Sequence, residues 1–302
     1  MEKTLIVITG PTGIGKTDTA INVARHLGTE IISADSRQIY RGIPIGTACP
    51  TAEELAAVKH HFINILNLDE YYSAAQYESD VLELLPKLFE RHDCVVMCGG
   101  SMMYVDAVCN GIDDIPTVSD DVRNEAYSIL ETEGLEEVAR RVKEVDPEYY
   151  EIADKQNAKR LVHALEIYMQ SGKPFSSFRT GAKKERPFRI LKYSLEMPRE
   201  ELFARINSRV DKMMELGLEE EARSVYHLRH LNSLNTVGYK EMFAYFDGTM
   251  DFITARERIK KNTRVYAKKQ MTWYAKDPDI IYLHPSTAVT EILNQLLEGE
   301  NT

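Results

Sequence analysis

The sequence predicts an α/β protein in which a parallel sheet is flanked by helices and interrupted by an inserted helical domain. Continuous apolar runs alternate with helical patterns along most of the chain, as in proteins built from βα units. Between residues 112 and 186 the strand signals stop, and several short helical segments follow one another. We therefore predict a core formed by residues 1–111 and 187–302, with residues 112–186 as the inserted domain.

A phosphate-binding loop follows the first apolar run. The segment GPTGIGKT fits the template G-x-x-x-x-G-K-[ST] at Gly10, Gly15, Lys16 and Thr17. Such a loop directs backbone N–H groups and a helix N-terminus at an anion, while the lysine adds a full charge and the threonine hydroxyl can meet Mg²⁺. An ordinary glycine turn is the alternative. The pattern makes the core P-loop NTPase-like and predicts a site for two linked phosphates. Its predicted residues are Gly10, Pro11, Thr12, Gly13, Ile14, Gly15, Lys16 and Thr17.

Composition restricts the class of protein. The 302 residues are 43% hydrophobic, which is enough for a sizeable core, and the formal charge of -10 argues against indiscriminate coating of nucleic acid. The N-terminal segment lacks the regions of a signal peptide, and no apolar run reaches the length of a membrane span. The four cysteines have no zinc spacing. We expect a cytoplasmic protein without membrane contact.

The next elements bring an acidic residue beside the phosphate loop. A helix is predicted from about Lys16 to Leu27, and the following short strand ends at Ala34-Asp35. Ligands bind at the carboxyl edge of open α/β sheets, so Asp35 and Ser36 lie where a site forms. Asp35 fits a catalytic role as well as the capping of a turn. Further on, Thr51-x-x-Glu54 predicts a capping box, and His60-His61 is interpreted as structural.

The third strand ends without an acidic residue. After a helix capped by Ser73 and ending near Glu90, the strand CVVMCGGS is continuously apolar and ends in Gly99-Gly100-Ser101. Nucleotide-hydrolysing P-loop proteins usually carry an aspartate at such a strand end to help hold Mg²⁺, so its absence weakens an ATPase interpretation. Ser101 offers a hydroxyl to phosphate or metal instead.

The inserted domain begins with a helix capped by Ser119. Its clearest helix runs from about Asn157 to Gln170. Lys159, Arg160 and His163 fall on or near one exposed face of that helix, which is either a solvated surface or a contact surface.

The second half of the core carries most of the basic residues that stand out. After the strand FRILKYSLEM, a long helix begins near Pro198 and resumes after Gly217. Its arginines either form surface ion pairs or point into a phosphate site; they are Arg199, Arg205, Arg209 and Arg223. A helix predicted from about Phe252 to Lys276 holds eight Lys or Arg residues from Arg256 onward, beside the only Trp. This is either a nucleic-acid contact or a solvated face. A strand IIYL and a helix from about Thr287 to Leu297 end the chain.

Taken in order, these segments resemble the tRNA dimethylallyltransferase (tRNA isopentenyltransferase) family over nearly the whole chain. The matching segments are GPTGIGKT at 10–17, DSRQIYRGIPIGTACP at 35–50, CGGSMMYVDAVCNG at 98–111, KRLVHALEIYMQSGKP at 159–174, GLEEEAR at 217–223, TVGYKEM at 236–242 and AKKQMTWYAK at 267–276. An ordered set of this kind is far more specific than one phosphate loop.

The resemblance implies transfer of a dimethylallyl group from dimethylallyl diphosphate to the N6 amine of adenosine 37, just 3′ of the anticodon, in tRNAs reading codons that begin with U. The phosphate loop then binds the leaving diphosphate. Lys16, Arg223 and a Mg²⁺ near Thr17 and Ser101 take up its charge, and Asp35 matches the general base. The adenosine must be flipped out of its stack to reach such a site.

The resemblance also implies the contacts with tRNA. Arg123 matches a position important for catalysis at the start of the inserted domain, which is itself expected to contact tRNA. The implied partner is the anticodon stem-loop, bound by a monomer. The implied contact residues are Asp35, Ser36, Arg37, Gln38, Lys159, Arg160, Leu161, Val162, His163, Asn235, Lys240, Lys268, Lys269 and Trp273.

Three positions depart from the family pattern, and three other functions remain open. Ser101 stands where many members have Thr, His163 replaces the second Arg of Gln-Arg-x-x-Arg, and Ala275 stands where Arg is frequent. These departures bear on tRNA binding more than on the chemistry. The alternatives are a prenyltransferase acting on free AMP or ADP, a P-loop kinase for a small metabolite, and a non-catalytic tRNA-binding module.

Overall fold

The computed structural model describes residues 2–298 and divides the chain into two compact units. Unit 2 is Asn110–Glu185, and unit 1 comprises the described residues before and after it. The predicted boundaries of the inserted domain lie within two residues of these. Each unit has its own apolar core.

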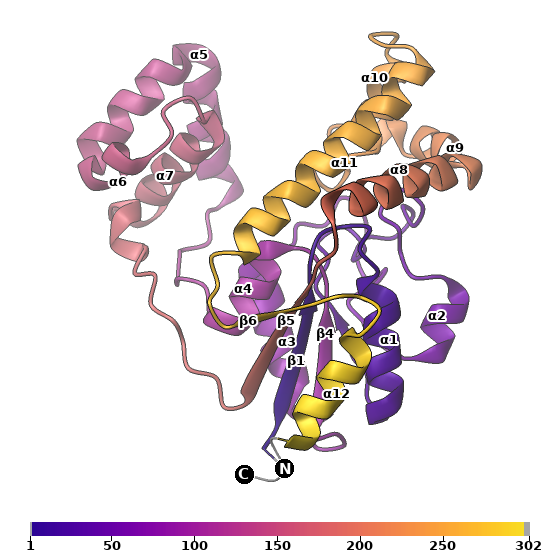
Figure 1. Ribbon diagram of the computed structural model, residues 1–302. Coiled ribbons are helices and arrows are strands. Elements are labelled where there is room, and N and C mark those ends of the chain that lie inside the picture. Colours follow the sequence, from indigo (N-terminus) through magenta and orange to yellow (C-terminus); the bar gives the residue numbers. More distant parts are fainter. Residues whose placement is uncertain (1, 299–302) are drawn as a thin grey trace. The chain divides into compact units, whose positions relative to one another are not determined.

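Unit 1 is built on a six-stranded sheet in the order β3-β2-β4-β1-β5-β6, and every neighbouring pair is parallel (Figure 1). The strands are β1 (Thr4–Thr9), β2 (Ile31–Ser33), β3 (His60–His61), β4 (Cys94–Cys98), β5 (Arg189–Leu195) and β6 (Ile280–Leu283). The α/β class predicted from the alternating patterns is confirmed.

Helices cover both faces of this sheet. Side chains of β1 alternate between them, so that Ile6 and Ile8 pack with α1 (Lys16–Leu27) and α12 (Ala288–Glu298). Leu5 and Val7 pack on the other face with α3 (Ala74–Phe89) and α4 (Met102–Asn110). Burial on both faces explains why the strands read as continuous apolar runs.

The predicted helix starts are confirmed. Thr51 and Glu54 form a capping box at α2 (Ala52–Ala57), and the Ser73 hydroxyl accepts the N–H of Gln76 at the start of α3. At α1, Gly28 in the left-handed region ends the helix.

A second helical layer of unit 1 lies beyond the carboxyl edge of the sheet. It contains α8 (Arg199–Glu215), α9 (Leu218–Ser224), α10 (Tyr239–Phe246) and α11 (Phe252–Tyr274), with 3₁₀ turns at Tyr226–Leu228 and Asn232–Leu234. These helices share an apolar cluster with the loop that follows β2, in which Ile39 and Ile43 are fully buried. That cluster fixes the helices over the strand ends.

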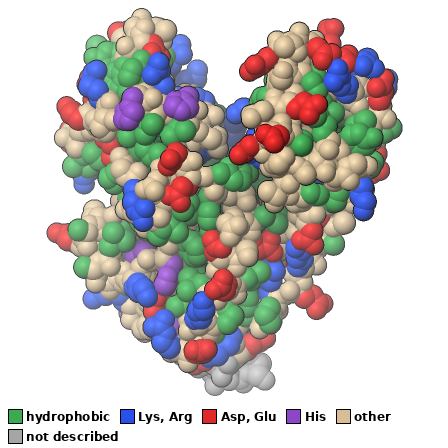
Figure 2. Space-filling view, turned by 180° about the vertical axis from the view of Figure 1, so that it is seen from behind, with side chains coloured by type: hydrophobic (Ala, Val, Ile, Leu, Met, Phe, Trp, Pro, Cys, Tyr) green, Lys and Arg blue, Asp and Glu red, His purple; other side chains and the backbone are tan. Residues whose placement is uncertain are grey.

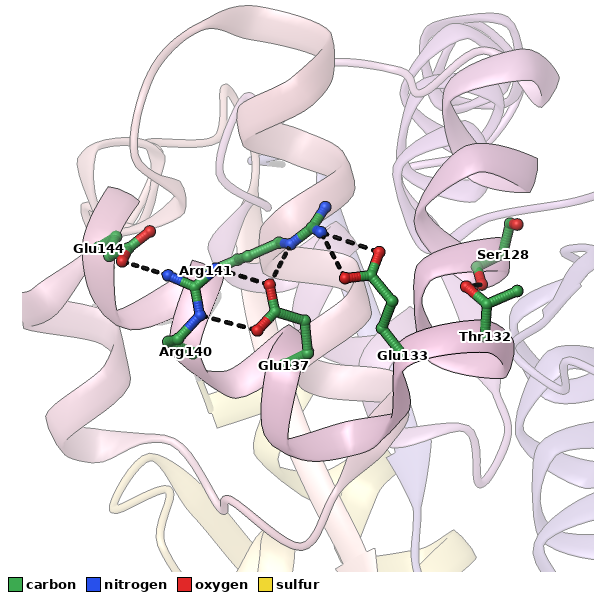
Figure 3. Close-up of polar contacts among 7 residues, drawn as sticks. All are labelled: Ser128, Thr132, Glu133, Glu137, Arg140, Arg141 and Glu144. Carbon is green, nitrogen blue, oxygen red and sulfur yellow. Dashed lines mark hydrogen bonds and ion pairs between the residues drawn. The ribbon is translucent and has the colours of Figure 1, made fainter.

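Unit 2 contains α5 (Asp120–Val145), α6 (Pro147–Ile152), α7 (Ala158–Ser171) and the 3₁₀ turn Phe175–Phe178. The expected series of short helical segments without intervening strands is found, because the 26 residues of α5 form two helices that meet at a kink, where Gly134 has φ 86°. The turn before the kink carries a hydrogen bond from the Thr132 hydroxyl to the Ser128 carbonyl. A network of glutamates and arginines spans the kink, from Glu133 just before it to Glu144 (Figure 3).

Three elements of unit 1 were not predicted from the sequence, namely the two-residue strand β3 and the helices α4 and α10. The His60-His61 pair forms β3, and the His61 ring contacts the Glu30 carboxylate at 2.6 Å, in line with the structural role predicted for the pair. In the described residues, no helix combines the length and apolarity that a membrane span requires. On the face shown in Figure 2, acidic and basic side chains are interspersed rather than segregated.

Candidate active site

The phosphate loop joins β1 to α1 at the carboxyl edge of the sheet. Gly15 has φ 104°, a conformation that L side chains rarely adopt, and it stands directly before the first turn of α1. The Lys16 ammonium donates to the carbonyls of Gly10 (3.0 Å) and Pro11 (2.9 Å). Because an ammonium has three donors, one stays available for an anion. Burial lowers the pKa of Lys16 to about 8.

Two arginines of α8 join the loop. Arg209 donates from Nη1 to the Thr12 hydroxyl (3.3 Å), and Arg205 donates from Nε to the Gly13 carbonyl (3.2 Å). Burial lowers the pKa of Arg209. Within residues 2–298, neither arginine forms an ion pair with a carboxylate. The sequence left open whether these arginines form surface ion pairs or point into a phosphate site. Arg205 and Arg209 point at the phosphate loop.

The predicted role of Arg223 is not supported by its position. Its guanidinium pairs with Glu219 (2.8 Å) and stacks over the Phe246 ring (4.1 Å), and its side chain is 59% exposed. It lines neither of the cavities described below. The physical reason is that α9 follows α8 after a break at Gly217, so that its arginine faces solvent while Arg209 faces the loop.

Gln270 of α11 was not identified from the sequence. Its side chain is 1% exposed and bridges two segments, since its Oε1 accepts the Thr12 N–H (2.8 Å) and its Nε2 donates to the Gly100 carbonyl (2.8 Å). Gln270 therefore ties the phosphate loop to the end of β4. The sequence offered one signal for this role, which is that Gln270 is a polar side chain on the inward face of a basic helix.

Asp35 lies two residues after β2, next to the end of β4. Its Oδ1 accepts the backbone N–H groups of Arg37 (2.9 Å) and Gln38 (3.3 Å). No hydrogen bond reaches Oδ2 from the part of the chain that the structure describes. The carboxylate is thus fixed through one oxygen, while the other can accept a proton.

Ser101 holds the residue next to Asp35. Its Oγ accepts the N–H of Ser36 (2.7 Å) and lies 3.1 Å from the Ser36 hydroxyl. Ser101 is therefore a neighbour of the carboxylate, and its predicted contact with a metal stays a prediction.

Two cavities of unit 1 meet at Asp35. A cavity of about 760 Å³ is bordered by the phosphate loop, Arg205 and Lys212. A second, of about 510 Å³, is bordered by residues predicted to contact tRNA, together with Tyr266. The two share Thr12, Gly13, Asp35 and Arg209. The cavity that contains the cations of the phosphate loop and the second cavity therefore both include the Asp35 carboxylate in their walls.

The predicted tRNA contacts of unit 1 divide into three groups. The second cavity is lined by Ser36, Arg37, Asn235, Lys240 and Lys269. Gln38 has a structural task, because its Nε2 donates to the carbonyls of Thr47 (3.2 Å) and Ala48 (2.9 Å). Lys268 lies over the Phe203 ring, and the Trp273 indole donates to Asp106 (3.0 Å). The basic helix α11 thus presents only part of its charge to the cavity.

In unit 2 the predicted tRNA contacts lie on α7, and two of the five are buried. Lys159, Arg160 and His163 are exposed, as predicted. Leu161 and Val162 are 0% and 1% exposed in the core of the unit, so their side chains cannot contact RNA. The expectation that all of residues 159–163 face the ligand is wrong, because a helix turns through more than one full turn over five residues.

Arg123 and His163 share one buried carboxylate. Glu166 lies 2.6 Å from the His163 Nδ1 and 3.8 Å from the Arg123 Nε. Arg123 also lies 3.8 Å from Asp120. Two residues that the resemblance marks as functional are thus oriented by Glu166, which the sequence reasoning missed.

The cavity of the phosphate loop is lined by the Thr17 hydroxyl and by three carboxylates, those of Asp18, Asp35 and Glu54. In residues 2–298 no group of three His, Cys, Asp or Glu side chains is arranged to hold an ion. The Thr17 residue borders the cavity of the phosphate loop, whereas Ser101 borders the other cavity. Mg²⁺ usually keeps several waters and takes phosphate oxygens as ligands. The residues present fit that mode with Thr17 as the protein ligand.

Comparison with known proteins gives one consistent result. The family model described as IPP transferase matches residues 38–277. The tRNA dimethylallyltransferase 1 of Phocaeicola vulgatus is 55% identical over 296 residues, which cover 98% of each chain. The protein of the same name from Bacteroides fragilis is 55% identical over 294 residues, with 97% of each chain covered.

The solved structures that superpose on this chain belong to the same family as these relatives. The full-length tRNA isopentenylpyrophosphate transferase of Bacillus halodurans superposes with a TM-score of 0.71 at 33% identity, covering 98% of this chain and 96% of its own. A eukaryotic dimethylallyltransferase acting on tRNA superposes with a TM-score of 0.81 at 26% identity, covering 94% of this chain and 75% of its own.

Proposed function

This chain belongs to the IPP transferase family and is a tRNA dimethylallyltransferase, and we propose that it transfers the dimethylallyl group of dimethylallyl diphosphate to the N6 amine of adenosine 37. The acceptors would be tRNAs that read codons beginning with U, and diphosphate would be released. The observation that carries this proposal is the pair of cavities that meet at Asp35. One suits a diphosphate, and the other suits a base delivered from the opposite side.

The cationic cavity would stabilise the leaving group. The C–O bond of an allylic diphosphate breaks by ionisation, so negative charge develops on the diphosphate rather than on an attacking water. Lys16, Arg205 and Arg209 converge on the phosphate loop, already oriented by carbonyl and hydroxyl partners. Preorganised donors of this kind contribute about 3 to 4 kcal/mol each to transition-state stabilisation.

The Asp35 carboxylate would act as the general base. The exocyclic amine of adenosine is conjugated with the purine ring and is a poor nucleophile, so it needs a hydrogen-bond acceptor that takes its proton during attack. Oδ1 is held by two N–H groups, which leaves Oδ2 for the amine. The base must leave its stack to reach this oxygen.

We propose Mg²⁺ as the cofactor, held by the Thr17 hydroxyl and by oxygens of the bound diphosphate. When bound, the ion neutralises part of the charge of the leaving group. Ser101 keeps its hydrogen bonds to Ser36 in this scheme.

For the anticodon stem-loop we propose two contact regions. In unit 1 these are the polar and basic residues around the second cavity, and in unit 2 the exposed Lys159, Arg160 and His163 together with the half-buried Arg123. We further propose that the enzyme acts as a cytoplasmic monomer.

The test is transfer to defined acceptors. Purified protein with Mg²⁺ and dimethylallyl diphosphate should prenylate an unmodified anticodon stem-loop much faster than free AMP. Asp35→Asn should bind diphosphate normally and lose transfer by at least about 10³-fold. Faster reaction with AMP would favour the mononucleotide enzyme, while consumption of ATP without an allylic diphosphate would favour a kinase. Near-normal turnover of Asp35→Asn would remove Asp35 from the role of base.

A further inference from the structure

The turn formed by residues 43–49 borders both cavities of unit 1. Gly46 and Thr47 line the second cavity, and Ala48 and Cys49 line the cavity of the phosphate loop. The turn is tightly wound, because Cys49 N donates to the Pro44 carbonyl (2.9 Å). Its Ala48 has φ 49°, which a residue other than glycine adopts only when its surroundings impose it. Something outside the turn must therefore hold it.

The Glu221 carboxylate of α9 provides that anchor. Its Oε2 accepts the N–H of Ile45 (2.8 Å), and its Oε1 accepts the N–H of Gly46 (2.7 Å). The hydroxyl of Tyr239, which is fully buried, donates to the same Oε1. A side chain at Gly46 would place its Cβ 2.5 Å from the Tyr239 hydroxyl oxygen, so only glycine lets the turn approach this closely. Three donors thus meet on one carboxylate.

The turn 43–49 also holds the segment that carries Asp35. Gln38 Nε2 donates to the carbonyls of Thr47 and Ala48, within the turn. The backbone N–H of the same Gln38 donates to Asp35 Oδ1. A continuous set of hydrogen bonds therefore connects Glu221 to Asp35 through the turn and Gln38.

We propose that Glu221 is a positioning residue that fixes Asp35 for proton transfer by way of the turn 43–49. The proposal rests on the proposed function, in which Asp35 is the base. It gives the GLEEEAR segment a role through its last glutamate rather than through Arg223. Removing the carboxylate would leave two backbone N–H groups without their acceptor, and the turn would relax to recover partners. A misplacement of about 1 Å in a reacting group costs about 10²-fold in rate.

The first test compares Glu221→Gln with Glu220→Gln. Glu220 is an exposed glutamate of the same helix, so its variant removes the same charge without touching the turn. Rates are measured with an anticodon stem-loop and normalised to sites that bind dimethylallyl diphosphate. We expect Glu221→Gln to lower kcat by about 10²-fold with the KM for dimethylallyl diphosphate within about twofold, and Glu220→Gln to match wild type. Unchanged normalised kcat in Glu221→Gln overturns the proposal.

A second test asks whether Glu221 acts through Asp35. In the Asp35→Asn background, Glu221→Gln should lower the residual kcat by less than about threefold, because groups acting as a unit are not additive. A further loss of about 10²-fold would mean that Glu221 acts elsewhere and would overturn the proposal. Tyr239→Phe removes one of the three donors and gives a milder variant, for which we expect a loss of about tenfold in normalised kcat and the same lack of additivity. If Asp35→Asn itself retains normal turnover, the proposed role of Asp35 as base fails, and this failure is distinguishable from a failure of the proposal for Glu221.

Discussion

The phosphate loop of unit 1 and the kinked helix α5 of unit 2 use charged side chains in opposite ways. Lys16, Arg205 and Arg209 bond to backbone carbonyls and a hydroxyl, and in the described residues they form no ion pair with a carboxylate. Arg140 and Arg141 on α5 are instead saturated by glutamates (Figure 3). The first arrangement leaves positive charge oriented and uncompensated, as an anion site requires.

The saturated arrangement serves a different purpose. Glu137 accepts hydrogen bonds from both arginines, while Glu133 and Glu144 each pair with one of them. These groups lie at the surface and cancel one another's charge, so they support the helix and solubility rather than recognition. A cluster of charged side chains therefore predicts a binding site only where those side chains lack partners of opposite charge.

The largest effect should come from removing an uncompensated cation. We expect Lys16→Ala to lower kcat/KM for dimethylallyl diphosphate by about 10³-fold, because a buried ammonium aimed at the leaving group is lost. Lys87→Ala is the matched control, since Lys87 is an exposed lysine already paired with Glu83. Steady-state kinetics of both variants would check this, and equal activities would contradict the contrast between the two kinds of cation.

The same lysine predicts a pH dependence of anion binding. Since burial lowers its pKa to about 8, Lys16 is protonated below that pH and becomes neutral above it. Only the protonated form attracts an anion, so the affinity for diphosphate should fall as pH rises through 8, by up to about tenfold per pH unit. Calorimetric titration with diphosphate between pH 6.5 and 9.5 measures this dependence. It should be absent in Lys16→Ala, and persistence there would assign it to another group.

Features with a local physical cause could be predicted from the sequence. The caps at Ser73 and Thr51 and the phosphate loop at Gly10 depend on neighbours within a few residues, and all are found in the structure. Strand β3 could not be predicted, since two residues carry no periodicity and their pairing with β2 is a tertiary contact.

The direction of long side chains needed the structure. In the structure Arg209 lies between Ile206 and Val210, which are both buried, so this part of α8 faces inward. Nothing local indicated that this face meets the phosphate loop, nor that Arg223 on the next helix faces solvent. Gln270 likewise gained its role from the crossing of α11 over two loops distant in the sequence. The sequence reasoning therefore could not assign contacts that depend on how the second helical layer meets the loops, as for Arg209 and Gln270.

A substitution in the apolar core of unit 2 should have an intermediate effect, and it tests whether the two units have separate tasks. Leu161 is fully buried there, so Leu161→Ala should destabilise unit 2 by about 2 to 5 kcal/mol. Diphosphate binding, which uses unit 1, should stay within about twofold of wild type, whereas transfer to the stem-loop falls. Leu85→Ala, in the core of unit 1, is the matched control and should weaken both. Denaturant unfolding and calorimetry measure the two effects, and loss of diphosphate binding in Leu161→Ala would contradict independent cores.

The smallest effect should come from the saturated network itself. Hydrogen bonds from Arg140 and Arg141 lower the pKa of Glu137 to about 2 from an ordinary 4.5. A carboxylate with a depressed pKa stabilises the fold above its unfolded pKa, and that contribution is lost as pH falls from about 4.5 through 2. Because the carboxylate lies at the surface of the unit and is partly accessible to solvent, Glu137→Gln should lower the thermal midpoint at neutral pH by less than about 2 °C. The neighbouring Glu136→Gln, which has no partner among the described residues, should be neutral. A difference between Glu137→Gln and wild type that stays constant from pH 7 to pH 2 would show that the network does not act through this carboxylate.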